Sequence, residues 1–158
     1  MVVHERPTGR PSAPTGGGLM VVETTAGGVA LLAGRLLFGG VLAFMGLNHF
    51  LQADGMASYA EGMGVPAARA SVLASGLVLV FGGLSLVLGA YPVLGGLAVL
   101  AFLAITTPTM HRFWAVEDPR QQQTEMTQFL KNVALAGGAL VLFAIGESSW
   151  PLALDLGL

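Results

Sequence analysis

The stretch ASVLASGLVLVFGGLSLVLGAYPVLGGLAVLAFLAITTPTMH, from Ala70 to His111, decides the fold class of this 158-residue chain. Its 42 residues carry no formal charge, and the residues that bound it are Arg69 and Arg112. A helix needs about 20 apolar residues to cross the hydrocarbon layer of a membrane, which is roughly 30 Å thick. The stretch therefore predicts two successive membrane-spanning helices.

The break between these two helices is predicted at Gly89-Ala90-Tyr91-Pro92. Glycine commonly ends a helix, and proline, which lacks an N–H, fits the first turn of the next one. We therefore expect helices at 70–88 and 93–107, the second of which continues through Pro108 to about residue 111.

Two further helices are predicted on either side of this stretch. Residues 29–47 form an apolar run with one charge, Arg35, and the run is longer than the apolar part of a cleavable signal peptide. Asp118 and Pro119 suit an N-cap and a first helical residue, so a last helix should begin outside the membrane and run to about Ile145. Only its part at 129–145 is apolar enough to span. Because short connections make neighbouring helices antiparallel, we predict an all-α integral membrane protein, a four-helix up-down-up-down bundle with both termini on one side.

The chain divides into a disordered Pro/Gly-rich tail (1–27), the four-helix domain (28–146) and a short interfacial tail (147–158), in which Trp150 suits the lipid headgroup region. Between the first two spans, Met56, Tyr59 and Met63 follow helical spacing and favour a short interfacial helix. Pairs of small residues four apart, which allow close packing of helices in lipid, occur at Gly39/Ala43, Ala70/Ala74, Ser71/Ser75 and Ala134/Gly138.

The composition limits the classes of function. Charged residues make up 10% of the chain and hydrophobic residues 54%, which argues strongly against a water-soluble enzyme. The net charge of -2 offers no basic field for nucleic acid. The absence of cysteine excludes dithiol chemistry, Cys-ligated zinc and iron–sulfur clusters, and no HxxH or HExxH spacing occurs. We therefore expect neither a metal nor a covalently bound cofactor.

Four antiparallel spans assign each connection to one of two faces. One face collects the ends of the first and third helices and the starts of the second and fourth, and it is rich in polar residues. Basic side chains at the ends of spans often extend to lipid headgroups, which is the alternative role for Arg112 and Lys131. The candidate ligand-binding residues on this face are Asn48, His49, His111, Arg112, Trp114, Lys131 and Asn132.

Arg35 is predicted to lie inside the first span, where a charge costs roughly 2.5–3.5 kcal/mol on insertion scales. The fourth helix ends on the face where the first begins, so Glu147 is the acid that the topology brings nearest. We predict an intramembrane ion pair between Arg35 and Glu147. Extension of the Arg35 side chain to the headgroups is the alternative.

Two stretches resemble the DoxX/DoxD-like family of small four-helix membrane proteins. They are GRLLFGGVLAFMGLNHF (34–50) and TPTMHRFWAVEDPRQQQTEMTQFLKNVALAGGALVL (107–142). The resemblance implies a four-span protein linked to membrane redox systems, since relatives include a subunit of a thiosulfate:quinone oxidoreductase. It adds weight to Arg35 and to the polar face. The chain departs from the family pattern at Leu79, Val80 and Phe81, where many relatives carry a Glu shortly before a double glycine.

These observations favour a membrane subunit of a redox system that binds a quinone headgroup and anchors a soluble oxidoreductase in the cell membrane. In this hypothesis His49 and His111 are proton donors. Lys131 and Asn132 donate hydrogen bonds to the headgroup, while Arg112 binds a partner carboxylate or a lipid phosphate. Because the chain holds no electron carrier, the protein is at most an accessory subunit of an oxidoreductase. The alternatives are a non-catalytic structural or chaperone-like membrane subunit, or a small lipid- or solute-handling membrane protein.

Overall fold

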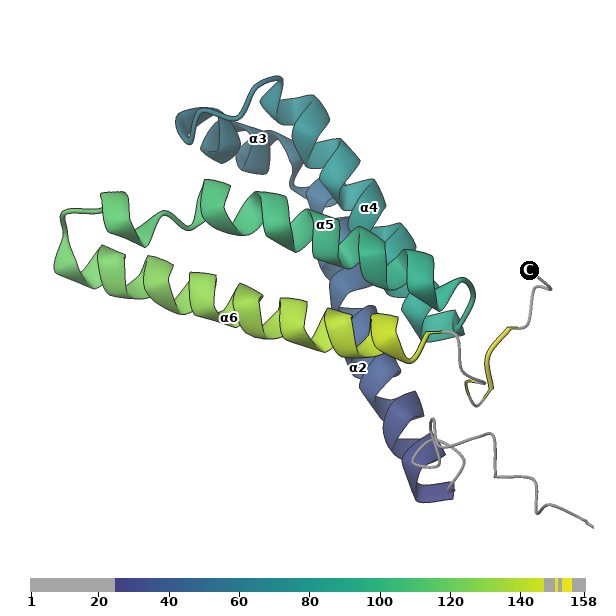
Figure 1. The fold of residues 1–158 in the computed structure, drawn as a ribbon. Helices are drawn as coiled ribbons and strands as arrows, with labels where there is room; N and C mark the ends of the chain where they lie inside the picture. Colours follow the sequence, from purple (N-terminus) through teal and green to yellow (C-terminus); the bar gives the residue numbers. More distant parts are fainter. Residues whose placement is uncertain (1–24, 147–149, 151, 155–158) are drawn as a thin grey trace, which may run out of the picture.

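A computed structural model describes residues 25–146, 150 and 152–154. Within these residues the regular structure is entirely helical, as predicted (Figure 1). Four helices are long and apolar enough to cross a membrane. The elements are α2 (Thr25–Leu51), α3 (Ala53–Gly62), α4 (Ala68–Leu88), α5 (Pro92–Met110), the 3-10 turn η1 (Phe113–Ala115) and α6 (Pro119–Ala144).

The first spanning helix is longer than predicted at both ends. It begins at Thr25, three residues before the expected domain boundary, and it continues to Leu51. Asn48 and His49 therefore lie in its last turns rather than in a connection. The rest of the predicted N-terminal tail lies outside the described residues. The short helix expected between the first two spans is α3, whose buried residues are Ala53 and Ala60.

Helices α2 and α4 pack backbone against backbone. A Cβ atom added to Gly83 would lie 2.5 Å from the Ala43 nitrogen and from the Gly39 carbonyl oxygen, and one added to Gly46 would lie 2.8 Å from the Gly76 carbonyl oxygen. Only glycine allows such an approach, which is the usual way that helices associate in lipid. Of the predicted small-residue pairs, Gly39/Ala43 lies in this contact, whereas Ala70 and Ala74 are exposed.

The turn between α4 and α5 follows the predicted glycine–proline signal. Gly89 ends α4 with φ of 68°, and Pro92 occupies the first turn of α5. Tyr91 also has a positive φ of 54°. The Ser85 hydroxyl contacts the carbonyl oxygens of Ala90 and Tyr91, 2.9 Å from the latter. These contacts stabilise the strained turn.

Helices α5 and α6 lie side by side and antiparallel, and they extend away from the line of α2 (Figure 1). Asp118 caps α6 as predicted, since its Oδ1 accepts a hydrogen bond of 2.8 Å from the Gln121 N–H. Pro108 lies inside α5, as expected. The spanning helices meet in one core, whose buried members are Leu42, Leu79, Leu86, Val99, Leu103, Ala139, Leu142 and Trp150.

Candidate functional site

At the turn end of the bundle, opposite the polar face, Arg35 is buried with 1% of its surface exposed. Its guanidinium carbon lies 5.7 Å from the centroid of the Trp150 ring, in cation–π geometry. Trp150, 7% exposed, donates its indole N–H to the Ile145 carbonyl at 2.8 Å. The sequence suggested a membrane interface for Trp150, but the ring packs into the protein core. Glu147 lies outside the described residues, so its pairing with Arg35 stays a prediction.

On the polar face, the central feature is a pair between His111 and Glu125. His111 directly follows α5, and its Nδ1 lies 2.8 Å from a carboxylate oxygen of Glu125 in the second turn of α6. The two side chains are only 23% and 17% exposed. An ionised carboxylate can only accept a hydrogen bond, so beside ionised Glu125 the Nδ1 atom of His111 carries the proton. The pair thus joins the ends of two spanning helices and orients the imidazole.

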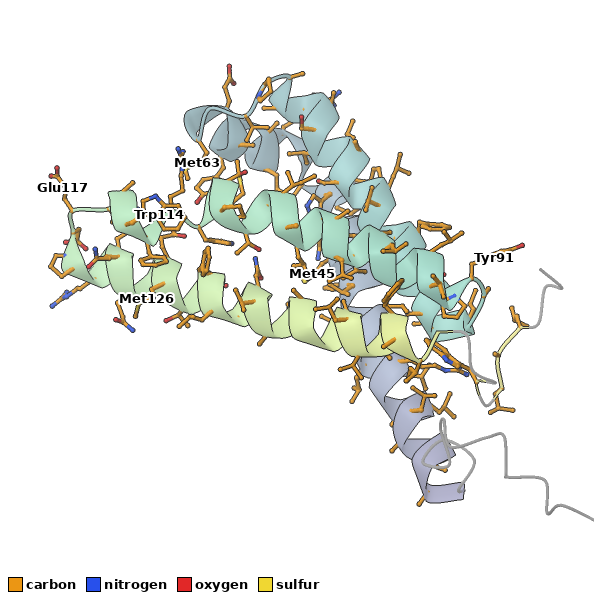
Figure 2. The ribbon with its side chains drawn as sticks, in the orientation of Figure 1. Met45, Met63, Tyr91, Trp114, Glu117 and Met126 are labelled. Atoms are coloured by element: carbon orange, nitrogen blue, oxygen red, sulfur yellow. The ribbon has the colours of Figure 1, made fainter. Side chains whose placement is uncertain are left out.

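Helix α3 is tied to the same end of the bundle. Arg112 donates a hydrogen bond of 2.9 Å from Nη2 to the carbonyl oxygen of Met63, the C-cap residue of α3. The pKa of Tyr59, in α3, is raised above its ordinary value of 10.0. The main cause is partial burial of the phenol, and the second is the negative charge of Glu125. Figure 2 shows Met63 and Trp114 at this end and Tyr91 at the opposite one.

Three aromatic rings stand beside the His111–Glu125 pair. Phe113 and Trp114 of η1 and Phe129 of α6 contact one another edge to face, with ring centroids 5.1, 5.5 and 5.9 Å apart. Trp114 remains exposed, as suits an aromatic side chain at a membrane interface. The rings form an apolar wall next to a titratable pair.

The other predicted histidine, His49, occupies a separate position. Its Nδ1 lies 2.8 Å from the Met45 carbonyl one turn earlier, and its ring stands edge to face with Phe102 at 6.2 Å. Phe102 lies nine residues before His111, about 13 Å along an α-helix. The structure therefore places the two histidines at different depths of the bundle. Asn48 is half-buried beside His49.

On α6, Lys131 and Asn132 diverge because successive helical residues point about 100° apart. Lys131 is exposed and donates to the side chain of Gln128. Asn132 is half-buried, and among the described residues its amide has no hydrogen-bond partner. Only Asn132 of this pair faces the helix bundle.

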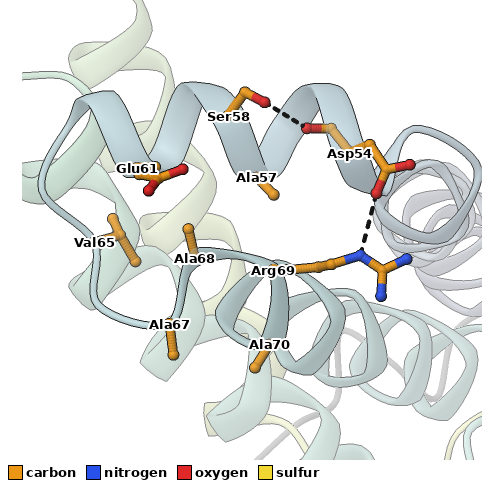
Figure 3. A pocket seen from close by; sticks show the side chains of 9 residues that line it. All are labelled: Asp54, Ala57, Ser58, Glu61, Val65, Ala67, Ala68, Arg69 and Ala70. Atoms are coloured by element: carbon orange, nitrogen blue, oxygen red, sulfur yellow. Dashed lines mark hydrogen bonds and ion pairs between the residues drawn. The ribbon is translucent and has the colours of Figure 1, made fainter.

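Between α3 and the start of α4 lies an open groove of about 610 Å³ (Figure 3). Arg69 and Asp54 form an ion pair of 3.1 Å across it, and both side chains are largely exposed. Such surface pairs contribute little stability. In the part of the chain that the structure describes, no three His, Asp or Glu side chains are grouped to hold a metal ion.

The sequence did not indicate two members of the site. Glu125 was not among the candidate residues, and its pairing with His111 depends on the register of α5 against α6. Thr107, one turn before His111, is buried within the bundle. Its sequence context, Thr106-Thr107-Pro108-Thr109, offers no signal that one threonine differs from its neighbours.

At the position where the resemblance led us to note a missing Glu, Leu79 is completely buried in the core, whereas Phe81 of α4 is exposed.

The comparisons with known proteins agree with the fold. The family model described as DoxX matches residues 30–112, from within α2 to two residues past the end of α5. No curated protein and no solved structure matches the chain. Because the family model covers more than half of the sequence and four helices can span a bilayer, this chain belongs to the DoxX family and is a multi-pass protein of the cell membrane.

Proposed function

We propose that this protein is the membrane subunit of a redox system and binds a quinone headgroup where α3, η1 and the start of α6 meet. The observation that carries the proposal is the half-buried His111–Glu125 pair with its wall of three aromatic rings. A titratable pair next to apolar surface at the end of a bundle suits a ligand with a polar head and a lipid tail.

The residues present fit a quinone headgroup. The ring nitrogen Nε2 of His111 makes no hydrogen bond to the described part of the chain. Asn132 supplies an amide that likewise lacks a hydrogen-bond partner there. These are hydrogen-bond donors suited to carbonyl oxygens, and Phe113, Trp114 and Phe129 offer aromatic surface for a planar ring.

Reduction of a quinone bound here to a quinol would require two electrons and two protons, of which His111 supplies one and water at this end of the bundle the other. In this proposal His111 delivers a proton from Nε2, because histidine exchanges protons near neutral pH. The Glu125 carboxylate accepts the Nδ1–H bond and holds the imidazole in one orientation. Arg112, which precedes η1, holds the end of α3 near this site through its hydrogen bond to the Met63 carbonyl. Tyr59 lies in the same short helix. The electrons come from the cofactor of a soluble oxidoreductase docked at this face.

The two tryptophans of the chain allow a direct test. Trp114 belongs to the proposed site, while Trp150 is buried beside Arg35 at the other end. We expect decylubiquinone to quench Trp114 fluorescence saturably in Trp150→Phe protein reconstituted in lipid nanodiscs. The matched Trp114→Phe protein, which retains only Trp150, should show no saturable component.

The histidine variants complete the test. His111→Ala should weaken saturable quenching at least tenfold, whereas His49→Ala, at another depth of the bundle, should change it less. If quenching is equal and unsaturable in both single-tryptophan proteins, the quinone proposal fails. The protein would then be better described as a structural membrane subunit, and a stoichiometric soluble partner in gently solubilised membranes would support that description.

A further inference from the structure

Thr107 differs from the two threonines that flank it on the same helix. Thr106 donates its hydroxyl to the Phe102 carbonyl at 2.7 Å, and Thr109 donates to the Ile105 carbonyl at 2.6 Å. The Thr107 hydroxyl is buried, the residue being 5% exposed, and finds no partner in the described part of the chain. A threonine hydroxyl in a helix can donate a hydrogen bond to the backbone carbonyl four residues earlier, but the Thr107 hydroxyl does not do so.

A buried hydroxyl without a hydrogen bond destabilises the protein that contains it. Valine has the same shape and would not carry this cost. The hydroxyl lies one helical turn deeper in the bundle than His111, whose backbone N–H bonds to the Thr107 carbonyl at 3.1 Å. Thr107 therefore continues the face of α5 that carries the His111–Glu125 pair.

The register of α5 against α6 brings Asn132 to the same level. The His111–Glu125 contact lies at one end of this antiparallel pair, and the contact of Gly96 with Phe143 lies toward the other. Between them, Asn132 falls within about one turn of Thr107. Its side chain is half-buried and lacks a hydrogen bond to any described residue. Two polar groups with open hydrogen-bonding capacity thus lie at one depth between apolar helices.

We propose that the Thr107 hydroxyl and the Asn132 amide form a donor subsite for one carbonyl oxygen of a membrane-soluble quinone. The inference rests on the function proposed above and adds a binding residue, Thr107, to it. The second carbonyl oxygen of the ring is left for His111. Because the Thr107 hydroxyl is closed off in the ligand-free structure, α5 and α6 must part locally to admit the quinone ring from the lipid, while the isoprenoid tail stays in the membrane.

The test compares Thr107→Val with Thr106→Val in the Trp150→Phe protein. Each change removes one hydroxyl from the same helix at nearly constant volume. The measurements are the Kd for decylubiquinone, from Trp114 quenching in nanodiscs, and the thermal midpoint of the ligand-free protein in detergent. We expect Thr107→Val to raise the Kd about tenfold, equivalent to about 1.4 kcal/mol, without lowering the thermal midpoint. Thr106→Val should leave the Kd unchanged, and Thr107→Ser, which keeps the hydroxyl, should restore binding.

A double-mutant cycle with Asn132→Leu sharpens the test. If both groups bind one carbonyl oxygen, the double variant should lose clearly less affinity than the product of the two single losses. Unchanged Kd in Thr107→Val, combined with weakened binding in His111→Ala, would overturn this inference and leave the proposed function standing. A lower thermal midpoint in Thr107→Val, with no change in Kd, would show that the hydroxyl is structural. If the wild-type protein shows no saturable binding, both proposals fail.

Discussion

Replacing Gly39 by alanine should weaken the packing of α2 against α4. The added Cβ would lie 2.6 Å from the Gly83 carbonyl oxygen and 3.1 Å from the Val87 nitrogen, both backbone atoms. Ordinary contact begins at 3.4 Å, so the two helices must separate locally by about 0.8 Å. The added Cβ would also lie 3.0 Å from the Val87 Cγ2 atom, but a change of rotamer there leaves the contacts with the two backbone atoms unrelieved.

Gly40 provides a matched control one residue away, since a Cβ added there meets nothing within 4 Å. Alanine gains about 0.5–1 kcal/mol over glycine in a helix interior, and both variants share this gain. The difference between them therefore isolates the interhelical contact. Overpacking a tight contact costs about 1–3 kcal/mol, so Gly39→Ala should be less stable than Gly40→Ala by that amount.

The assay is equilibrium unfolding of both purified variants and the wild-type protein by sodium dodecyl sulfate in mixed micelles, followed by circular dichroism. Gly40→Ala should match or exceed the wild-type protein in stability, and Gly39→Ala should fall below it. Equal stability of the two variants, or a larger loss for Gly40→Ala, would refute the assignment of Gly39 to the α2–α4 contact.

Three further expectations concern other parts of the bundle. Asp118→Ala removes the N-cap of α6 and should cost about 0.5–2 kcal/mol, seen as faster hydrogen exchange confined to the first turn of α6. Arg112→Ala removes the hydrogen bond to the Met63 carbonyl, so amides of α3 should exchange faster while those of α4 keep their wild-type rates. Reporter fusions after Ala90 and after Leu158 should lie on the same side of the membrane, because two spans precede the first position and four precede the second. Opposite locations would contradict four spans.

Features that depend on local chemistry were predictable from the sequence. Gly89 and Pro92 mark the α4–α5 turn, and Asp118 marks the start of α6, because each acts through its own backbone or its nearest neighbours. The end of α2 was predicted too early. His49 looked like the start of a polar connection, but the helix continues to Leu51, and the His49 ring lies 2.8 Å from the Met45 carbonyl one turn earlier.

Features that depend on register between helices were not predictable. His111 and Glu125 are 14 residues apart, and only the pairing of α5 with α6 brings them together. The three threonines near Pro108 have the same chemistry, and only its burial and its missing hydrogen bond distinguish Thr107. Asn132 could be listed as a candidate, but which face of α6 carries it follows from packing.

The contact between Arg35 and Trp150 has a consequence for biosynthesis. The two residues are separated by 115 positions, and chains grow at about 5–20 residues per second. Arg35 is therefore synthesised roughly 6–23 seconds before the indole that covers its guanidinium. During that interval Arg35 depends on water, lipid phosphates or the insertion machinery, and the translocon tolerates one arginine at a cost of roughly 2.5–3.5 kcal/mol. In chains stalled before Trp150, the Arg35 side chain should consequently be more accessible to a water-soluble reagent than in the complete chain.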